Sequence, residues 1–171
     1  VGDYFYMANS SFEYFPGIPI HKSNDLVNWN LIGHGLQREA QCTGAVNLVD
    51  VQPNGGIYAP TLRYHDGTFY IITTAIYVDA KTKKHGGNNF IITATDPAGP
   101  WSDPVVVQGA PGIDPDLFFD EDGRLWYTGQ QKPKDPEFID QKEIWMQELN
   151  LETFQLMGER YHLWRGACDG V

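Results

Sequence analysis

The chain has 171 residues and carries 22 acidic side chains against 12 lysines and arginines, which gives a formal net charge of −10. That length suits one domain with a sizeable core, and so acidic a chain disfavours nucleic acid and anionic membranes as partners. No apolar stretch approaches the length that crosses a bilayer, so we expect a soluble chain and favour the cytoplasm over secretion.

The first predicted strands lie within residues 1–33. Residues 1–11 are rich in aromatic side chains after the remnant of a turn, and they resemble the second half of a hairpin whose first half is missing. A loop over residues 13–17 leads to a short strand over residues 18–23. A polar turn over residues 24–29 and a strand over residues 30–33 follow.

The same order of elements returns in the second third of the chain. Residues 60–74 predict two strands joined by a hairpin at Asp66-Gly67. Residues 90–95 predict the next strand, residues 96–101 a turn that ends on a tryptophan, and residues 102–107 an outgoing strand. A strand, an Asp-Gly hairpin and a polar turn therefore form a repeated unit.

A third unit begins at Asp114-Pro115. It turns at Asp122-Gly123, continues through residues 143–149 and reaches a polar turn over residues 150–154. The Asp-Gly pair predicts positive φ at both central positions of its hairpin. The proline that follows Asp114 predicts an extended backbone at this aspartate.

The repeated markers recur at intervals of 53 to 72 residues. Four short strands repeated at such intervals are typical of a β-propeller, whereas a jelly roll or a sandwich has no reason to repeat a turn and an aromatic residue in register. We therefore predict an all-β chain that covers roughly three blades of a larger ring. The remainder of the propeller, or a second copy of the chain, would cover the open blade faces. The markers are the turn glycines Gly2, Gly67 and Gly123 and the turn-closing aromatics Trp29, Trp101 and Phe154.

Alignment of the units places Ala59-Pro60 against Asp114-Pro115. The matching dipeptide of the first unit would lie about six or seven residues before Val1, and such first strands line the channel of a propeller. Carboxylates that converge there suit glycoside hydrolysis, in which an inverting enzyme uses an acid and a base roughly 6.5 to 9.5 Å apart. Asp114 is a candidate for one of these groups, or for a third acid that raises the pKa of its neighbour. Asp116 is a rival candidate, and a turn-capping role for Asp114 is the structural alternative.

Four segments resemble glycoside hydrolase family 43, especially its β-xylosidases and α-L-arabinofuranosidases. They are SSFEYFPGIPIH (10–21), DLVNW (25–29), GGIYAPTLRYHDG (55–67) and GIDP (112–115). The resemblance runs across essentially the whole chain. It implies a five-bladed β-propeller that hydrolyses xylan-derived or arabinose-bearing oligosaccharides with inversion.

The resemblance also implies roles for particular residues. Asp114 matches the aspartate that modulates the pKa of the general acid, while the general base and the general acid fall before Val1 and after Val171. The chain alone is therefore predicted to be inactive, as a partial catalytic domain over residues 1–171 that lacks the N-terminal strand and the later blades. Residues that match sugar-binding positions of the family are Phe12, Tyr58, Ala59, Pro60 and Ile113.

Two of these matches depart from the family pattern. Tyr58 replaces a tryptophan, which shortens the stacking face and adds a hydroxyl, and Ile113 stands where xylosidases often carry phenylalanine. Packing between blades is the structural alternative for Phe12 and Tyr58. A non-catalytic carbohydrate-binding propeller and a retaining fructan or sucrose hydrolase are the functional alternatives.

The cysteines and histidines predict no metal site and no cofactor. Cys42 and Cys168 are expected to be free thiols, and neither belongs to a Cys-x-x-Cys motif. The five histidines are scattered without the spacing of metal ligands. A calcium ion in the central channel is a possibility that the sequence leaves open.

Overall fold

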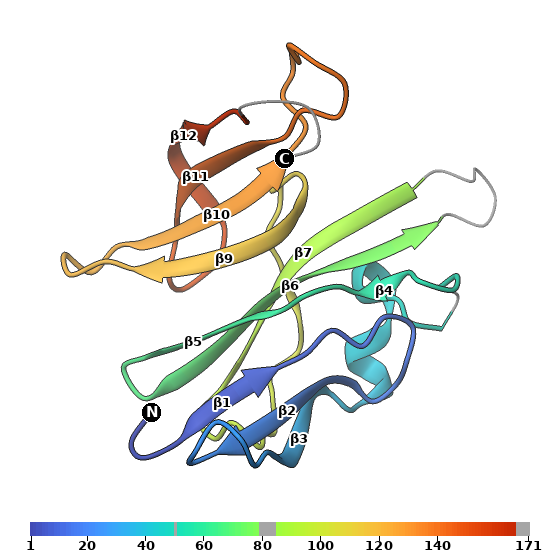
Figure 1. Ribbon diagram of the computed structural model, residues 1–171, viewed down its shortest axis with the longest axis vertical. Coiled ribbons are helices and arrows are strands. Elements are labelled where there is room, and N and C mark those ends of the chain that lie inside the picture. Colours follow the sequence, from blue (N-terminus) through green and yellow to red (C-terminus); the bar gives the residue numbers. More distant parts are fainter. Residues whose placement is uncertain (50, 79–84, 167–171) are drawn as a thin grey trace.

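The computed structural model describes residues 1–49, 51–78 and 85–166, and these residues form twelve β-strands and two short 3₁₀ helices. The strands build three antiparallel sheets that follow one another along the chain (Figure 1). Nowhere in the described ranges is a helix long and apolar enough to cross a membrane. Cys42 is a buried free thiol, and Cys168 lies outside the described residues.

The first sheet has the order β1-β2-β3. It contains β1 (Phe5–Ala8), β2 (Gly17–Ser23) and β3 (Asn30–Leu36), and the 3₁₀ helices η1 (Glu39–Cys42) and η2 (Gly44–Val46) follow it. In the described part of the chain β1 pairs with β2 alone. The expectation that residues 1–11 contain a strand is confirmed for Phe5–Ala8, whereas its interpretation as half of a hairpin stays a prediction.

The second sheet is built around the long strands β6 (Thr68–Val78) and β7 (His85–Ala94). Both β4 (Gly56–Ile57) and β5 (Thr61–His65) pair with β6, so together they form one innermost strand that is interrupted at residues 58–60. The outgoing strand β8 covers only Val105–Val106, which is shorter than the expected strand over residues 102–107.

The third sheet has the order β12-β11-β10-β9. It consists of β9 (Ile113–Phe119), β10 (Leu125–Gln131), β11 (Glu143–Leu149) and β12 (Leu156–Trp164). Each strand pairs with its neighbour in the sequence, which is the topology of a propeller blade.

The two Asp-Gly hairpins differ in geometry. Asp66 and Gly67 both have positive φ, 44° and 79°, as a two-residue hairpin loop requires. In the hairpin of the third sheet Gly123 has a positive φ of 83°, whereas Asp122 does not have a positive φ. The prediction of positive φ for Asp122 is therefore wrong. The reason is the longer loop, in which the Gly123 N–H donates to the Asp120 carbonyl oxygen at 3.1 Å and a single left-handed glycine completes the turn.

The three polar turns share a side-chain cap. Asp25, Asp96 and Asn150 each accept the backbone N–H two residues further on, at 2.9, 2.8 and 3.0 Å. The backbone N–H of Asn28 is the main reason why the pKa of Asp25 lies well below its usual range. Trp101, which closes the second turn, is 1% exposed. The repeat read from the sequence is therefore a structural repeat.

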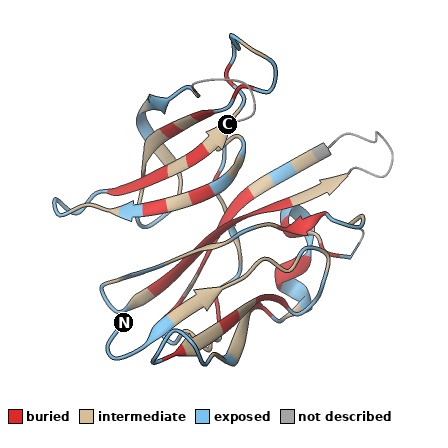
Figure 2. Ribbon diagram, in the orientation of Figure 1, coloured by how far each residue is buried: buried red, intermediate tan, exposed pale blue. Residues whose placement is uncertain are grey.

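The core lies between successive sheets. Phe69 and Ile71 of β6 belong to a cluster shared with the first sheet, whereas Tyr70 and Ile72 belong to a cluster shared with the third. Because side chains alternate across a strand, β6 supplies both clusters and the middle sheet is buried on both faces. Figure 2 shows the buried residues gathered along β6 and β7. Three sheets packed in succession confirm the prediction of three blades and exclude a two-layer sandwich.

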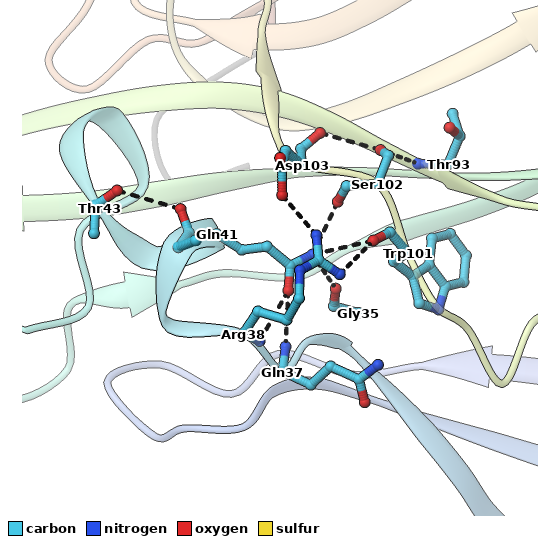
Figure 3. A network of polar contacts seen from close by, with 10 residues as sticks. Gly35, Gln37, Arg38, Gln41, Thr43, Thr93, Trp101, Ser102 and Asp103 are labelled. Atoms are coloured by element: carbon cyan, nitrogen blue, oxygen red, sulfur yellow. Dashed lines mark hydrogen bonds and ion pairs between the residues drawn. The ribbon is translucent and has the colours of Figure 1, made fainter.

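A buried glutamine joins the first two blades. Gln41 of η1 is 1% exposed. Its amide oxygen accepts the backbone N–H groups of Gln37 and Arg38, and its amide nitrogen donates to the carbonyl oxygens of Gly35 and Ser102, at 2.8 to 3.2 Å (Figure 3). One side chain thus satisfies backbone groups of both blades.

Replacement of Gln41 by alanine is expected to lower the free energy of unfolding by about 2 to 3 kcal/mol, because it leaves several buried backbone groups without partners. Denaturant titration of the protein measures the loss. Asp103→Asn is the control: it removes an exposed ion pair to Arg38 (2.6 Å) and should cost less than about 1 kcal/mol. Equal losses for the two variants would contradict the role of Gln41.

Candidate functional site

Asp114 lies on a β-bulge at the start of β9. Asp116 pairs with Thr128 and Ile113 pairs with Gln130, so two residues of β9 oppose one residue of β10. Asp114 has φ 54°, and the expectation of an extended backbone is therefore wrong. The backbone of β9 must turn locally to accommodate the extra residue before regular pairing with β10 continues. Aspartate tolerates the left-handed conformation that this turn requires better than most residues do.

The chain comes very close to β10 just before the bulge. Gly112 has φ 83°, and a Cβ atom there would overlap the carbonyl oxygen of Gln130. Only glycine therefore allows this approach. The side chain of Asp114 is exposed, and it has no hydrogen-bond or ion-pair partner among the described residues. Its carboxylate is free to face a ligand.

The rival carboxylate, that of Asp116, forms an ion pair with Arg63 of the neighbouring blade. Its Oδ2 atom lies 2.6 Å from a terminal guanidinium nitrogen of Arg63, and Arg63 Nε donates to the Leu117 carbonyl oxygen at 3.0 Å. This ion pair links β5 to β9. Asp116 therefore has a structural role that Asp114 lacks.

Tyr58, Ala59 and Pro60 occupy the interruption between β4 and β5. The next residue, Thr61, donates its hydroxyl to the carbonyl oxygen of Pro115 at 3.0 Å. This contact places Ala59-Pro60 beside Asp114-Pro115. The two dipeptides that the repeat aligned thus lie on adjacent innermost strands, each at a point where the regular ladder is broken.

Phe12 and Tyr58 are brought together across blades. Phe12 exchanges backbone hydrogen bonds of 2.9 Å with Ile57, and the rings of Phe12 and Tyr58 meet edge to face with centroids 6.0 Å apart. The Phe12 side chain is 42% exposed among the described residues. Thr73 Oγ1 donates to the Tyr58 carbonyl oxygen at 2.9 Å and fixes the backbone of this segment.

Asn89 of β7 holds the segment that leads into the bulge by hydrogen bonds to its backbone. The sequence analysis did not identify Asn89 as a site residue. Asn89 is 2% exposed. Its amide nitrogen donates to the carbonyl oxygens of Ala110 and Gly112 at 3.1 and 3.2 Å, and its amide oxygen accepts the Thr74 hydroxyl at 2.6 Å. The sequence gives no usable signal for Asn89, because its partners lie on other segments of the chain.

Within the described ranges no three His, Cys, Asp or Glu side chains lie close enough together to share a metal ion. Half-buried Ile113 pairs with Gln130 beside the bulge. The site therefore consists of one free carboxylate, an aromatic pair and two broken inner strands. Such a set can stack against a sugar ring and place a negative charge beside it.

Comparison with known proteins identifies relatives along the whole chain. The family model described as glycosyl hydrolases family 43 matches residues 1–170. A xylosidase/arabinosidase of Butyrivibrio fibrisolvens is 44% identical over 99% of this chain and 31% of the relative. A non-reducing end α-L-arabinofuranosidase of Bacteroides ovatus is 46% identical over 74% of this chain and 22% of the relative.

Solved structures agree with the sequence relatives. A xylan β-1,4-xylosidase from Bacillus halodurans superimposes with a TM-score of 0.81 at 36% identity, over 98% of this chain and 31% of that structure. A protein of the same family from a capybara gut metagenome superimposes with a TM-score of 0.82 at 36% identity, over 99% of this chain and 30% of that structure. The chain thus spans less than a third of the length of each of these proteins.

Proposed function

Since the chain belongs to glycosyl hydrolase family 43, whose solved structures are five-bladed β-propellers, we propose that it is part of the catalytic domain of a longer protein. That protein hydrolyses xylan-derived or arabinose-bearing oligosaccharides as a β-xylosidase or α-L-arabinofuranosidase, with inversion at the anomeric carbon. The family membership, and relatives with both activities in their names, support this proposal.

The observation that carries the proposal is the free carboxylate of Asp114 at the start of an innermost strand. The hydrogen bond between Thr61 and Pro115 brings the segment of Asp114 next to Ala59-Pro60, and Tyr58 of the aromatic pair directly precedes Ala59. Catalysis by inversion needs an acid that is protonated and a base that is ionised at the same pH. Asp114 supports this division because its negative charge disfavours ionisation of a neighbouring acid and so raises that acid's pKa.

Phe12 and Tyr58 form the sugar-binding wall in this proposal. Sugar rings present C–H faces that pack well on aromatic surfaces, and Phe12 leaves such a surface exposed. Tyr58 adds a hydroxyl at its rim. The general base and the general acid belong to parts of the protein outside residues 1–171, in blades that complete the ring.

The isolated 171-residue chain is expected to hydrolyse neither p-nitrophenyl β-D-xyloside nor p-nitrophenyl α-L-arabinofuranoside, whereas the full-length protein hydrolyses at least one. The missing acid and base each contribute roughly 10² to 10⁴ to the rate. Release of p-nitrophenol measures hydrolysis of each substrate by the isolated chain and by the full-length protein. NMR of the anomer that forms first reports whether the full-length protein inverts configuration. Turnover by the chain at the rate of the full-length protein would contradict the placement of both groups, and sugar binding without turnover by the full-length protein would favour a carbohydrate-binding propeller.

A further inference from the structure

A polar cavity of about 590 Å³ opens at the third blade, beside the bulge. It lies between the end of β10, the start of β11 and the end of β12, and we call it the cationic cavity. The side chains on which its chemistry depends are Gln131, Lys132, Lys134, Glu143, His162 and Arg165.

A buried carboxylate organises one wall of the cationic cavity. The side chain of Glu143 is 4% exposed and accepts a hydrogen bond from Gln131 Nε2 at 2.5 Å. His162 Nδ1 lies 3.1 Å and Arg165 Nε 3.8 Å from its other oxygen. Gln141, 1% exposed, donates to the Arg165 carbonyl oxygen at 2.5 Å. The wall is thus held by buried polar contacts, and the half-exposed His162 and Arg165 are fixed at its rim.

The cavity gathers positive charge in an acidic chain. Lys132 and Lys134 are exposed and have no hydrogen-bond or ion-pair partner in the part of the chain that the structure describes. Arg160 and Arg165 also line the cavity, against the acids Asp135 and Glu143. Two lysines and two arginines therefore line the cavity with two carboxylates, and a third carboxylate, that of Glu137, lies 3.8 Å from Arg165, in a protein whose net charge is −10. Such a local excess favours an anionic ligand.

The cationic cavity adjoins the candidate site directly. Gln131 follows Gln130, the pairing partner of Ile113. A Cβ atom on Gly112 would lie only 3.1 Å from the Gln131 Cα atom, so the cavity wall touches the segment that carries Asp114. The candidate site and the cationic cavity therefore share the contact between the start of β9 and the end of β10.

We propose that the cationic cavity binds the carboxylate of a uronic acid unit carried by the oligosaccharide substrate. This inference rests on the proposed function, because it takes the neighbouring site to be a sugar site. Lys132 and Lys134, which have no partner among the described residues, supply charge-assisted hydrogen bonds to the carboxylate. A singly charged carboxylate suits the cavity better than a phosphate dianion, because Asp135 and Glu143 oppose a second negative charge.

The decisive experiment compares two substrates with the full-length protein. The probes are xylotriose and xylotriose with a glucuronic acid branch, and the measurement is kcat/KM from release of xylose. The double substitution Lys132→Gln and Lys134→Gln is expected to lower the ratio of branched to unbranched kcat/KM about tenfold. Lys142→Gln is the matched control, since Lys142 is exposed in the same loop but does not line the cavity.

Binding of free D-glucuronate, D-glucose and inorganic phosphate by calorimetry separates the two proposals. Binding of glucuronate that the double variant loses and Lys142→Gln keeps supports the cavity, even if neither oligosaccharide is hydrolysed and the proposed hydrolase activity therefore fails. Hydrolysis of both oligosaccharides with an unchanged ratio in the double variant would overturn the cavity proposal and leave the proposed function intact. Phosphate that binds as tightly as glucuronate, or glucuronate that binds no better than glucose, would also overturn it.

Discussion

Replacement of Asp114 by asparagine is expected to lower kcat of the full-length protein by about 10²-fold to 10³-fold, with little change in stability. Asparagine has the same shape and tolerates a φ of 54° nearly as well as aspartate, so the bulge should survive. In the proposed function this substitution removes only the negative charge beside the reacting groups, and a charge placed in this way acts mainly on the transition state. Steady-state kinetics on both p-nitrophenyl glycosides, together with thermal unfolding, separate the two effects.

The pH profile gives the same substitution a specific signature. In the proposed mechanism the carboxylate of Asp114 raises the pKa of the general acid, because a second nearby negative charge is unfavourable. Without that charge the general acid loses its proton at a lower pH. The basic limb of kcat/KM should therefore move to lower pH in Asp114→Asn, and an unchanged basic limb would argue against the modulating role.

Asp116→Asn is the matched control, two residues away on the same strand. Asp116 pairs with Arg63 at 2.6 Å, and both side chains are partly exposed. Loss of such a pair should cost less than about 1 kcal/mol and leave kcat within about twofold. If Asp116→Asn abolished activity while Asp114→Asn did not, the two carboxylates would have to exchange roles.

The features that the sequence predicted are those encoded by a few consecutive residues. The hairpin at Asp66-Gly67 follows from residues that accept positive φ, and the turn over residues 24–29 follows from a run of short polar side chains. Because these signals recur in register, they also predicted the blades. The match of Phe12 to a sugar-binding position came from family resemblance and stays a prediction; the structure shows that its ring contacts the ring of Tyr58.

The features that the sequence did not predict depend on distant partners. The left-handed backbone of Asp114 overrides the preference set by Pro115, because the ladder with β10 requires an extra residue there. Asn89 gave no usable signal either. Its partners Thr74 and Gly112 are 15 and 23 residues away, so only the folded blade shows what the amide does.

Replacement of Asn89 by alanine is expected to lower kcat by about 10-fold to 100-fold and to cost about 2 to 4 kcal/mol of stability. The stability loss follows because two carbonyl oxygens and the Thr74 hydroxyl lose their buried partner. The loss of kcat follows because the segment before Asp114 is no longer fixed, and a displacement of about 1 Å near the chemistry is worth up to about 10²-fold. KM should change less than kcat.

Gln41→Ala distinguishes positioning from general destabilisation. It too removes a buried amide that satisfies backbone groups, but between the first two blades and away from the bulge. At a temperature where both variants are fully folded, Asn89→Ala should have the lower kcat although the two losses of stability are similar. Thr74→Val adds a graded test. It removes the hydrogen bond from the Thr74 hydroxyl to Asn89 and leaves the two bonds from the Asn89 amide to carbonyl oxygens in place. The kcat of Thr74→Val should therefore lie between the kcat of Asn89→Ala and that of the unmodified protein. Equal kcat values for Gln41→Ala and Asn89→Ala would mean that Asn89 stabilises the blade without positioning Asp114.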